Sequence, residues 1–276
     1  MIITFYGTRG STPMPEEGYL KSGGHTSSIL LEFNSGDVVI LDAGTGIRKI
    51  GQHLSARPEG VPENIFIGMS HTHWDHIQGF PFFGPAYNPR QKLTIAISGE
   101  DYDASDLETV FKTQMQSEFF PVPLDQMGAK ITFWQPNLNR YTTSNGITIQ
   151  SIKHNHPGNA YTYRIEELST TIVYCTDIEH GESIDERIVE LASGVDLLIH
   201  DAMYTNEQLK TRKGWGHSSW EQAVEVAERA EVQLLALFHH DPDHDDTFLD
   251  KIEEDARERF PASFLAREGM AIKILP

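Results

Sequence analysis

Short apolar runs separated by polar loops repeat along the whole chain of 276 residues. Most runs are rich in β-branched and aromatic residues and are bounded by Gly, Asn or Asp, a pattern typical of buried strands. Strands are therefore predicted at 1–6, 28–33, 38–41, 65–69, 93–97, 130–134, 146–152, 160–165, 172–176, 195–199, 232–238 and 270–275. The turn at 34–37 joins two of these runs and predicts a hairpin.

Apolar residues at helical spacing predict helices between the strands. In the clearest case Ser218 is the expected N-cap and Glu221 lies three residues later, which is the signature of a capping box. Helices are predicted from about 47, after 76, and at 106–116, 218–230 and 246–260. Strands that end in Gly- and Asp-rich loops before helices indicate an α/β fold with its loops gathered at one sheet edge. Because no repeat or low-complexity linker divides the chain, we expect a single domain over 1–276.

Composition narrows the class of protein. A hydrophobic fraction of 39% is that of an ordinary globular domain. The only cysteine, Cys175, excludes an intramolecular disulfide and fits a reducing compartment. No apolar run approaches membrane-spanning length, and the N-terminus lacks the basic start and long apolar stretch of a signal peptide. We therefore expect a cytoplasmic protein without a membrane partner.

The charge balance bears on partners. A formal net charge of −18 argues against long nucleic acid, whose phosphates are held by clustered Lys and Arg. A small anionic substrate is compatible with it, because bound metal ions can dominate the local field. The apolar stretches at 80–85 and 119–123 could form walls for such a substrate, a homodimer contact or core. The oligomeric state stays open.

The densest chemistry lies directly after the predicted strand at 65–69. His71, His73, Asp75 and His76 fall within six positions. Alternate side chains share one face of a strand, so His71 and His73 should emerge together where this strand ends. Neutral imidazoles and a carboxylate suit zinc, and also manganese or iron. The pattern predicts a divalent metal site.

Other predicted strands also end in possible metal ligands. Asp42, His156, Asp177 and His239 each follow an apolar run. Ligands at the ends of different strands converge on one edge of such a fold. One ion needs three or four protein ligands and two need about seven. The count fits two ions.

These residues carry a resemblance that covers nearly the whole chain. Through the motif H-x-H-x-D-H at 71–76, the sequence resembles the metallo-β-lactamase-fold hydrolases. The resemblance implies a four-layer αβ/βα sandwich of two mixed sheets flanked by helices. It implies two divalent ions per chain, zinc first, with manganese and iron as alternatives. It assigns His71, His73 and His156 to one ion and Asp75, His76 and His239 to the other. Asp177 and a hydroxide would bridge the ions, and Asp42 with Gly44 would support them from below.

Within that family the sequence looks closest to the phosphodiesterase branch, which includes cyclic-nucleotide and cyclic-phosphate phosphodiesterases and transfer-RNA 3′-processing nucleases. His200-Asp201-Ala202-Met203 stands where the nucleases have His-Glu-Ala-Thr, and Gly216-His217-Ser218-Ser219 where they have Gly-His-Ser-Thr. Asp for Glu is a departure that leaves the role of Asp201 open. The resemblance implies catalytic roles for Asp75, His217 and Asp201, with His217 contacting the phosphate or protonating the leaving alkoxide and Asp201 orienting it. True β-lactamases of this fold lack both segments, which disfavours antibiotic hydrolysis.

The spacing of the ligands bears on the substrate. The transfer-RNA nucleases commonly carry a long arm between the third histidine and the bridging aspartate, but His156 and Asp177 are only 21 positions apart. We therefore predict cleavage of a small phosphodiester, a cyclic nucleotide or a ribosyl cyclic phosphate, by the bridging hydroxide. Carboxylic-ester or lactone hydrolysis by the same site is the alternative, and a metal-binding module without turnover is the non-enzymatic one. His154, His240, Asp241 and His244 are candidate supports, whereas His25, His53 and His180 are unassigned.

Overall fold

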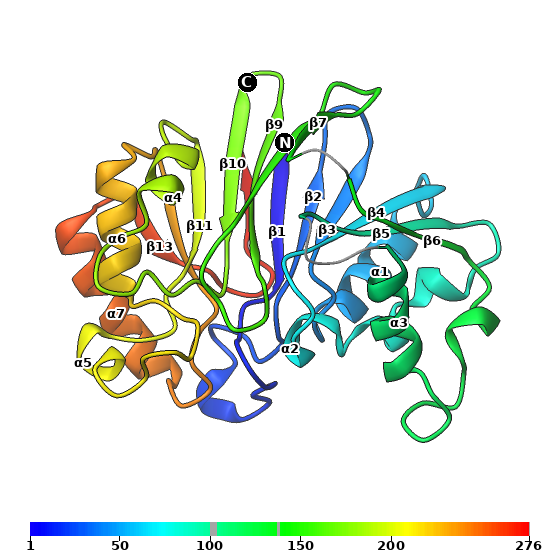
Figure 1. Ribbon diagram of the computed structural model, residues 1–276, viewed down its shortest axis with the longest axis horizontal. Helices are drawn as coiled ribbons and strands as arrows, with labels where there is room; N and C mark the ends of the chain where they lie inside the picture. The colour runs from blue at the N-terminus through cyan, green and yellow to red at the C-terminus, as the bar shows by residue number, and fades with distance from the viewer. Residues whose placement is uncertain (100–103, 137–138, 276) are drawn as a thin grey trace.

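The computed structural model describes residues 1–99, 104–136 and 139–275. They contain two seven-stranded mixed sheets that lie face to face at the centre of the molecule (Figure 1). The first sheet has the order β14-β1-β2-β3-β4-β5-β6 and the second β13-β12-β11-β10-β9-β8-β7. This arrangement confirms the predicted four-layer αβ/βα fold with two mixed sheets.

The first sheet is antiparallel on one side and parallel on the other. Antiparallel pairs join β14, β1, β2 and β3, and parallel pairs join β3, β4, β5 and β6. Its strands are β1 (Ile2–Gly7), β2 (Ser28–Glu32), β3 (Val38–Leu41), β4 (Asn64–Met69), β5 (Lys92–Ile97), β6 (Lys130–Trp134) and β14 (Ala271–Lys273). The pairing of β2 with β3 confirms the predicted hairpin.

The second sheet repeats this plan. Antiparallel pairs join β7, β8, β9 and β10, and parallel pairs join β10, β11, β12 and β13. Its strands are β7 (Arg140–Thr142), β8 (Thr148–Lys153), β9 (Tyr161–Glu167), β10 (Thr170–Cys175), β11 (Leu197–Asp201), β12 (Leu235–Phe238) and β13 (Ser263–Leu265). The carboxyl ends of β8, β10, β11 and β12 therefore lie at the same edge of this sheet.

Helices cover the outer faces of both sheets (Figure 1). On the first sheet lie α1 (Ile47–Ala56), the single-turn α2 (Trp74–Ile77) and α3 (Ala104–Gln114); on the second lie α4 (Glu186–Leu191), α5 (Asn206–Leu209), α6 (Trp220–Arg229) and α7 (Asp246–Arg259). Short 3₁₀ turns span Glu17–Tyr19, Phe80–Phe82, Gly84–Tyr87 and Leu124–Gln126. In α1 the residues Ile47, Ile50 and Leu54 form one apolar stripe that is fully buried, which fixes this helix on the sheet.

Two apolar cores hold the layers together. The larger one fills the space between the sheets, where Phe238 contacts Phe5 and Tyr174 with ring centroids 6.1 and 5.8 Å apart. The smaller one lies between the second sheet and its helices and includes Leu198 and Val224. Burial raises the pKa of Cys175 in this core, so the thiol is a packing group.

Several predicted elements needed correction. The capping box of α6 is formed by Ser219 and Gln222 and not by Ser218 and Glu221. Ser218 instead donates its hydroxyl to the Ile178 carbonyl at 2.5 Å, so it cannot serve as the cap. His217 consequently precedes the helix and is not its first residue. The prediction also omitted β7, β13, α4 and α5, which are short and lack a clear period.

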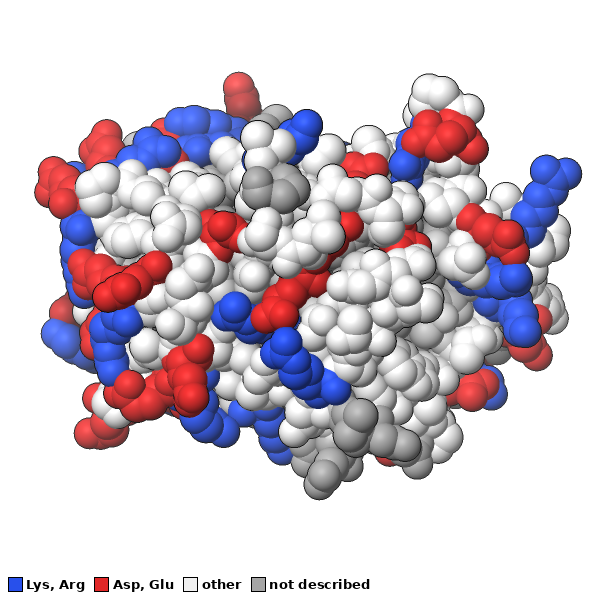
Figure 2. All heavy atoms as spheres, turned by 90° about the horizontal axis from the view of Figure 1, so that it is seen from above, with Lys and Arg blue, Asp and Glu red and all other residues white. Residues whose placement is uncertain are grey.

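The surface carries both signs of charge. On the face seen from above, Lys and Arg alternate with Asp and Glu around a broad area of uncharged residues (Figure 2). This face therefore shows no continuous basic stripe of the kind that follows a nucleic-acid backbone. Among the described residues, no helix combines the length and apolar character needed to span a bilayer.

Candidate metal centre

The polar residues that follow the strands meet at one end of the sandwich, next to α2, which lies in the lower half of Figure 1. The structure brings all the predicted ligands together there, in two adjoining groups. The histidine group consists of His71, His73 and His156, and the mixed group of Asp75, His76, Asp177 and His239. In each group the ligand atoms lie within 4.8 Å of one another.

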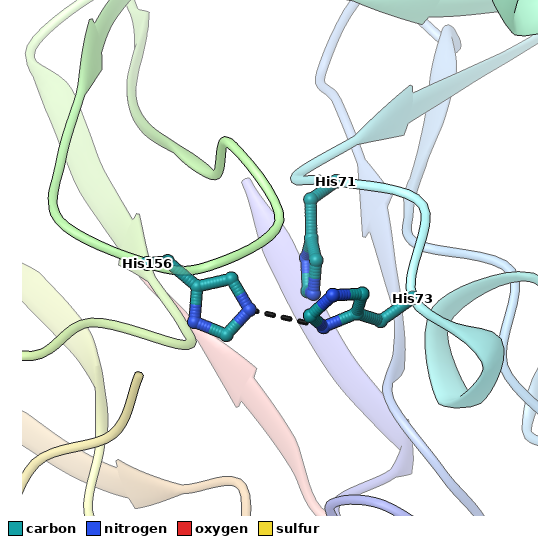
Figure 3. Close-up of side chains that lie close together, drawn as sticks. All are labelled: His71, His73 and His156. Carbon is teal, nitrogen blue, oxygen red and sulfur yellow. Dashed lines mark hydrogen bonds between the residues drawn. The ribbon is translucent and has the colours of Figure 1, made fainter. Parts of the chain in front are cut away.

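In the histidine group, the three imidazoles converge from two different sheets (Figure 3). His71 and His73 follow β4, whereas His156 lies in the loop between β8 and β9. Nε2 of His156 is 3.0 Å from Nδ1 of His73, and the rings of His71 and His156 are 4.7 Å apart. His73 is exposed, while His71 is fully buried. The group is therefore open to solvent on the His73 side.

Neighbouring groups fix which nitrogen of each imidazole faces the centre. His71 donates from Nδ1 to Ser70 Oγ at 3.0 Å, and His156 donates from Nδ1 to the Gly216 carbonyl at 2.9 Å. Both rings therefore offer Nε2 as a ligand. Gly216, with a φ of +89°, lies so close that an added Cβ would come within 2.1 Å of the His156 ring. Only glycine fits this contact.

The mixed group is buried throughout. Nε2 of His239 lies 3.1 Å from Asp75 Oδ2 and 3.3 Å from Nε2 of His76. The backbone N–H of Ser11 donates to the same Asp75 oxygen at 2.8 Å. The sequence analysis did not assign Ser11 to this centre, because its contribution comes from the main chain of a loop 64 residues away.

Asp177 joins the two groups through different oxygens. Its Oδ1 lies 3.2 Å from Nε2 of both His76 and His239, in the mixed group. Its Oδ2 lies 3.6 Å from Nε2 of His71, in the histidine group. A carboxylate shared in this way can serve two ions at once.

Asp42 supports the mixed group from below. Its Oδ2 accepts hydrogen bonds from His76 Nδ1 at 2.8 Å and from the hydroxyls of Tyr174 and Ser70, both at 2.7 Å. Its Oδ1 accepts from the Ser70 backbone N–H at 2.7 Å. The network holds the His76 ring so that Nε2 faces the centre.

Backbone strain is concentrated at this centre. Asp42, Asp177 and His239 have φ values of 58°, 54° and 63°, in the left-handed region that non-glycine residues seldom adopt. Asp42 and His239 directly follow β3 and β12, and Asp177 lies two residues beyond β10, so a sharp turn at each aims the side chain back over the sheet edge. This backbone conformation costs about 1–3 kcal/mol per residue, and residues held in it are typical of functional sites.

The donor set fits divalent metal ions. Nε2 of His71 is buried and has no hydrogen-bond partner among the described residues, although it faces the other ligands. Burial pushes the pKa of His71 well below its usual value, so this nitrogen keeps its lone pair. Burial opposes the ionisation of Asp75 and Asp177, but the surrounding histidines outweigh it and hold both pKa values well below the usual range. Neutral imidazoles beside ionised carboxylates are a ligand set for zinc, manganese or iron.

His217 and Asp201 form a pair next to the two groups. Nδ1 of His217 donates to Asp201 Oδ2 at 2.8 Å, and lies 3.9 Å from Asp177 Oδ2. Asp201 Oδ1 accepts from the backbone N–H groups of Met203 and Ser218, both at 3.1 Å. Burial lowers the pKa of His217, but Asp201 outweighs it and raises the pKa to about 9. Asp201, the position at which the sequence departs from the resemblance, thus reaches the histidine directly.

Of the remaining histidines that the sequence analysis named, one contacts the centre and the others form hydrogen bonds or contacts elsewhere. His154 donates from Nε2 to the Asp177 carbonyl at 3.0 Å and so touches the centre. The neighbours of the last ligand point elsewhere: His240 bonds the Ala266 carbonyl at 2.8 Å and His244 pairs with Gln208 at 2.7 Å. The Asp241 carbonyl accepts from buried Arg9 at 3.1 Å. Away from the ligands, His180 stacks on His200, His25 bonds Thr45, and His53 lies near Glu32.

The sequence and the fold were compared with those of known proteins. Residues 38–240 match the beta-lactamase superfamily domain. Ribonuclease Z of Anoxybacillus flavithermus is 26% identical over 318 positions, which cover 100% of this chain and 98% of that protein. Ribonuclease Z of Azobacteroides pseudotrichonymphae is 37% identical, but over 113 residues that are 41% of this chain and only 37% of the relative.

Among solved structures, the metallo-beta-lactamase fold protein YhfI from Bacillus subtilis superposes with a TM-score of 0.70 at 22% identity, over 98% of both chains. The matched segment 38–240 contains every residue of the histidine group and the mixed group, together with Asp42, Asp201 and His217.

Proposed function

The chain belongs to the beta-lactamase superfamily, and we propose that this metal-dependent phosphoester hydrolase uses two divalent ions to cleave a small phosphodiester, a cyclic nucleotide or a ribosyl cyclic phosphate. The family match confirms the resemblance drawn from the motif at 71–76. The full-length relative named Ribonuclease Z supports phosphoester hydrolysis as the reaction class. The number of ions and the substrate are the new parts of the proposal.

The observation that carries the use of two ions is the division of Asp177 between two ligand groups. His71, His73 and His156 would hold one ion, and Asp75, His76 and His239 the other, with Asp177 shared. Zinc suits this imidazole-rich set best, with manganese and iron as alternatives. Bound there, the ions would supply an acidified water and neutralise charge on the phosphoryl oxygens.

In this proposal His217 is the general acid of the reaction. Its raised pKa keeps the imidazole protonated at neutral pH, and Asp201 occupies Nδ1, so Nε2 is the nitrogen left to act on the substrate. From Nε2 the proton passes to the leaving alkoxide. Asp201 is itself fixed by two backbone N–H groups and therefore acts as the positioning residue.

Two features support a small substrate although the relative is named a ribonuclease. Residues 157–176, between His156 and Asp177, are all described and contain only a short loop and the β9–β10 hairpin, which leaves no arm there. The Ribonuclease Z alignment runs over 318 positions, although this chain has 276 residues, so that relative contains segments without a counterpart here.

A hollow of suitable size lies between α2, which carries Asp75 and His76, and α3. It has a volume of about 500 Å³ and is lined by Trp74, Val110 and Phe119 among others. Trp74 is 58% exposed and directly precedes Asp75 in α2. Apolar hollows of roughly 300–1,000 Å³ take small organic ligands. A nucleobase or sugar could therefore rest on Trp74 while its phosphodiester reaches the ions.

A substrate panel tests the proposal. We expect the zinc- or manganese-loaded protein to hydrolyse bis-p-nitrophenyl phosphate and at least one cyclic nucleotide or ribosyl cyclic phosphate, and to leave precursor transfer RNA and acyl lactones largely intact. Efficient endonucleolytic cleavage of structured RNA at physiological salt would refute the small substrate. Turnover of lactones without any phosphodiester would instead establish the carboxylic-ester reading.

A further inference from the structure

A second hollow adjoins the metal centre on the side of His217. It has a volume of about 190 Å³, and its wall includes Glu179, Asn206, Lys210, Lys213, His217 and Gln222. Pockets that bury a whole small ligand are usually roughly 300–1,000 Å³, so this one has room for only part of a substrate. His217 belongs both to this wall and to the pair that it forms with Asp201, so the hollow adjoins the metal centre. We name it the lysine pocket.

Hydrogen-bond donors dominate the lysine pocket. Lys210 and Lys213 pair with Glu207 and Glu182, but the lysine side chains are 68% and 76% exposed, and ion pairs at such positions are weak. Their ammonium groups can therefore exchange these partners for an anion that enters the pocket.

The two amides of the wall have their oxygens engaged within the fold. Asn206 Oδ1 accepts from the Ser219 hydroxyl at 2.6 Å, and Gln222 Oε1 accepts from the Ser219 backbone N–H at 3.1 Å. Each amide thus has its NH₂ group left as the available polar end. The single carboxylate of the wall, Glu179, already accepts from the Gly214 and Gly216 N–H groups at 2.8 and 2.9 Å.

The loop that carries the lysines is held in place. Arg212 packs against the rings of Tyr204 and Trp215, 4.8 and 5.9 Å from their centroids. Glu179 ties the far end of the loop at Gly214 and Gly216, and the Gly216 carbonyl in turn receives the His156 hydrogen bond. The lysine pocket therefore has a fixed position relative to the metal ligands.

The charge of this loop is opposite to that of the chain. The sequence carries 40 acidic against 22 basic residues, yet 210–217 contains three of the basic residues and no acidic one. In the wall of the pocket, Lys210 and Lys213 stand against the single carboxylate of Glu179, and this charge beside the metal centre favours a substrate with more than one anionic group.

We propose that the natural substrate carries a second phosphate, which binds to Lys210 and Lys213 in the lysine pocket while the scissile phosphodiester lies at the metal centre. This inference rests on the proposed function and narrows it to phosphodiesters of phosphorylated nucleosides or sugars. The terminal phosphate is bound by charge-assisted hydrogen bonds and takes no part in bond cleavage.

Binding of stable product-like nucleotides tests the inference without turnover. Calorimetry on the zinc-loaded protein would compare adenosine 5′-monophosphate with adenosine 2′,5′- and 3′,5′-bisphosphate. We expect at least one bisphosphate to bind about tenfold tighter than the monophosphate, an advantage that shrinks as salt is raised. The double variant Lys210→Met, Lys213→Met keeps the aliphatic stems and should remove the advantage.

Lys251→Met is the matched control, because Lys251 is an exposed lysine on α7 whose partners are Glu254 and Asp255. It should keep the full bisphosphate advantage. The inference is overturned if every bisphosphate binds no tighter than the monophosphate, or if the advantage survives in the double variant. If the protein hydrolyses bis-p-nitrophenyl phosphate but shows no bisphosphate advantage, the inference about the second phosphate is wrong and the proposed function stands. If it binds a bisphosphate tightly but hydrolyses no phosphodiester, the proposed function is wrong and the lysine pocket is a phosphate-binding site only.

Discussion

The histidine group and the mixed group share Asp177 and differ in almost everything else. The histidine group has three neutral imidazoles, one of them exposed, and its supports are a serine hydroxyl and a glycine carbonyl. The mixed group has two carboxylates, is buried throughout, and rests on the Asp42 network. One ion would therefore be bound by charge in a closed environment, and the other by neutral ligands beside solvent.

With an ion in each group, as proposed, the site would combine one tightly held ion with one that is accessible from solvent. Ionised Asp75 and Asp177 attract a cation strongly in a buried setting, where the field is screened little. The open histidine group leaves room for a substrate oxygen to approach. We expect the ion of the mixed group to exchange slowly and the ion of the histidine group to exchange first.

Removal of the shared ligand is the strongest test of this division. Asp177→Asn retains a residue type that tolerates the φ of 54° but loses the charge that faces both groups. We expect metal content to fall from two ions to one or fewer, and kcat/KM for bis-p-nitrophenyl phosphate to fall by about a thousandfold. Elemental analysis and initial rates would show this, with Asp125→Asn, an exposed aspartate, as control. A stoichiometry of one ion in the unaltered protein under saturating metal would contradict the use of two ions.

His217 belongs to neither group and separates chemistry from metal binding. His217→Ala should retain both ions and lower kcat by roughly a hundredfold, the usual scale for a positioned acid. The loss should be smaller for a p-nitrophenyl ester, because its leaving group needs little protonation. Equal losses for good and poor leaving groups would indicate phosphate binding instead, and unchanged kcat and KM would exclude His217 from the mechanism.

A change below the mixed group should affect only one of the two groups. Asp42→Asn keeps the shape and tolerates the φ of 58°, yet weakens the support of His76. We expect affinity for the ion of the mixed group to fall by roughly ten- to a hundredfold, while the histidine group is nearly unaffected. Tyr174→Phe is the matched control, since it removes one hydrogen bond to Asp42 and leaves the contact with His76. Metal titration with a chelator in competition resolves the two affinities, and an equal loss at both would contradict the separation.

The sequence predicted which residues meet at this centre, because they follow strands whose apolar runs are easy to recognise. The short motif at 71–76 and the strand-end residues Asp42, His156, Asp177 and His239 all lie at the centre. The family resemblance supplied their grouping, which spacing alone could not. The expected single domain over 1–276 remains a prediction.

What the sequence could not predict comes from the main chain and from distant loops. The Ser11 N–H on Asp75 and the Gly216 carbonyl on His156 leave no mark in side-chain chemistry. The capping box of α6 was misplaced by one residue because Ser218 and Ser219 are adjacent and Glu221 and Gln222 satisfy the same pattern. The lysine pocket also went unpredicted, because it depends on where the short helix α5 packs beside α6.

The smallest expected effect concerns protons, and it follows from the charge of each group. Burial lowers the pKa of His76, but Asp177, Asp75 and Asp42 outweigh it and raise the pKa well above the usual value. At pH 7 His76 therefore carries a proton that an incoming ion must displace. His71 has a pKa well below its usual value, because burial disfavours its charged form, and has no proton to lose.

Metal binding to the mixed group should accordingly release about one proton at pH 7, and affinity there should fall by up to about tenfold for each pH unit below the His76 pKa. The histidine group should lose affinity only at lower pH, where its imidazoles begin to take up protons. Calorimetry of zinc binding in buffers of different ionisation enthalpy measures the release directly. His73→Ala removes the exposed ligand of the histidine group and should retain the proton release of the mixed group. Asp42→Asn should reduce that release, because it removes one of the charges that raise the pKa of His76. Equal pH slopes for the two ions would show that the groups do not differ in charge as the structure indicates.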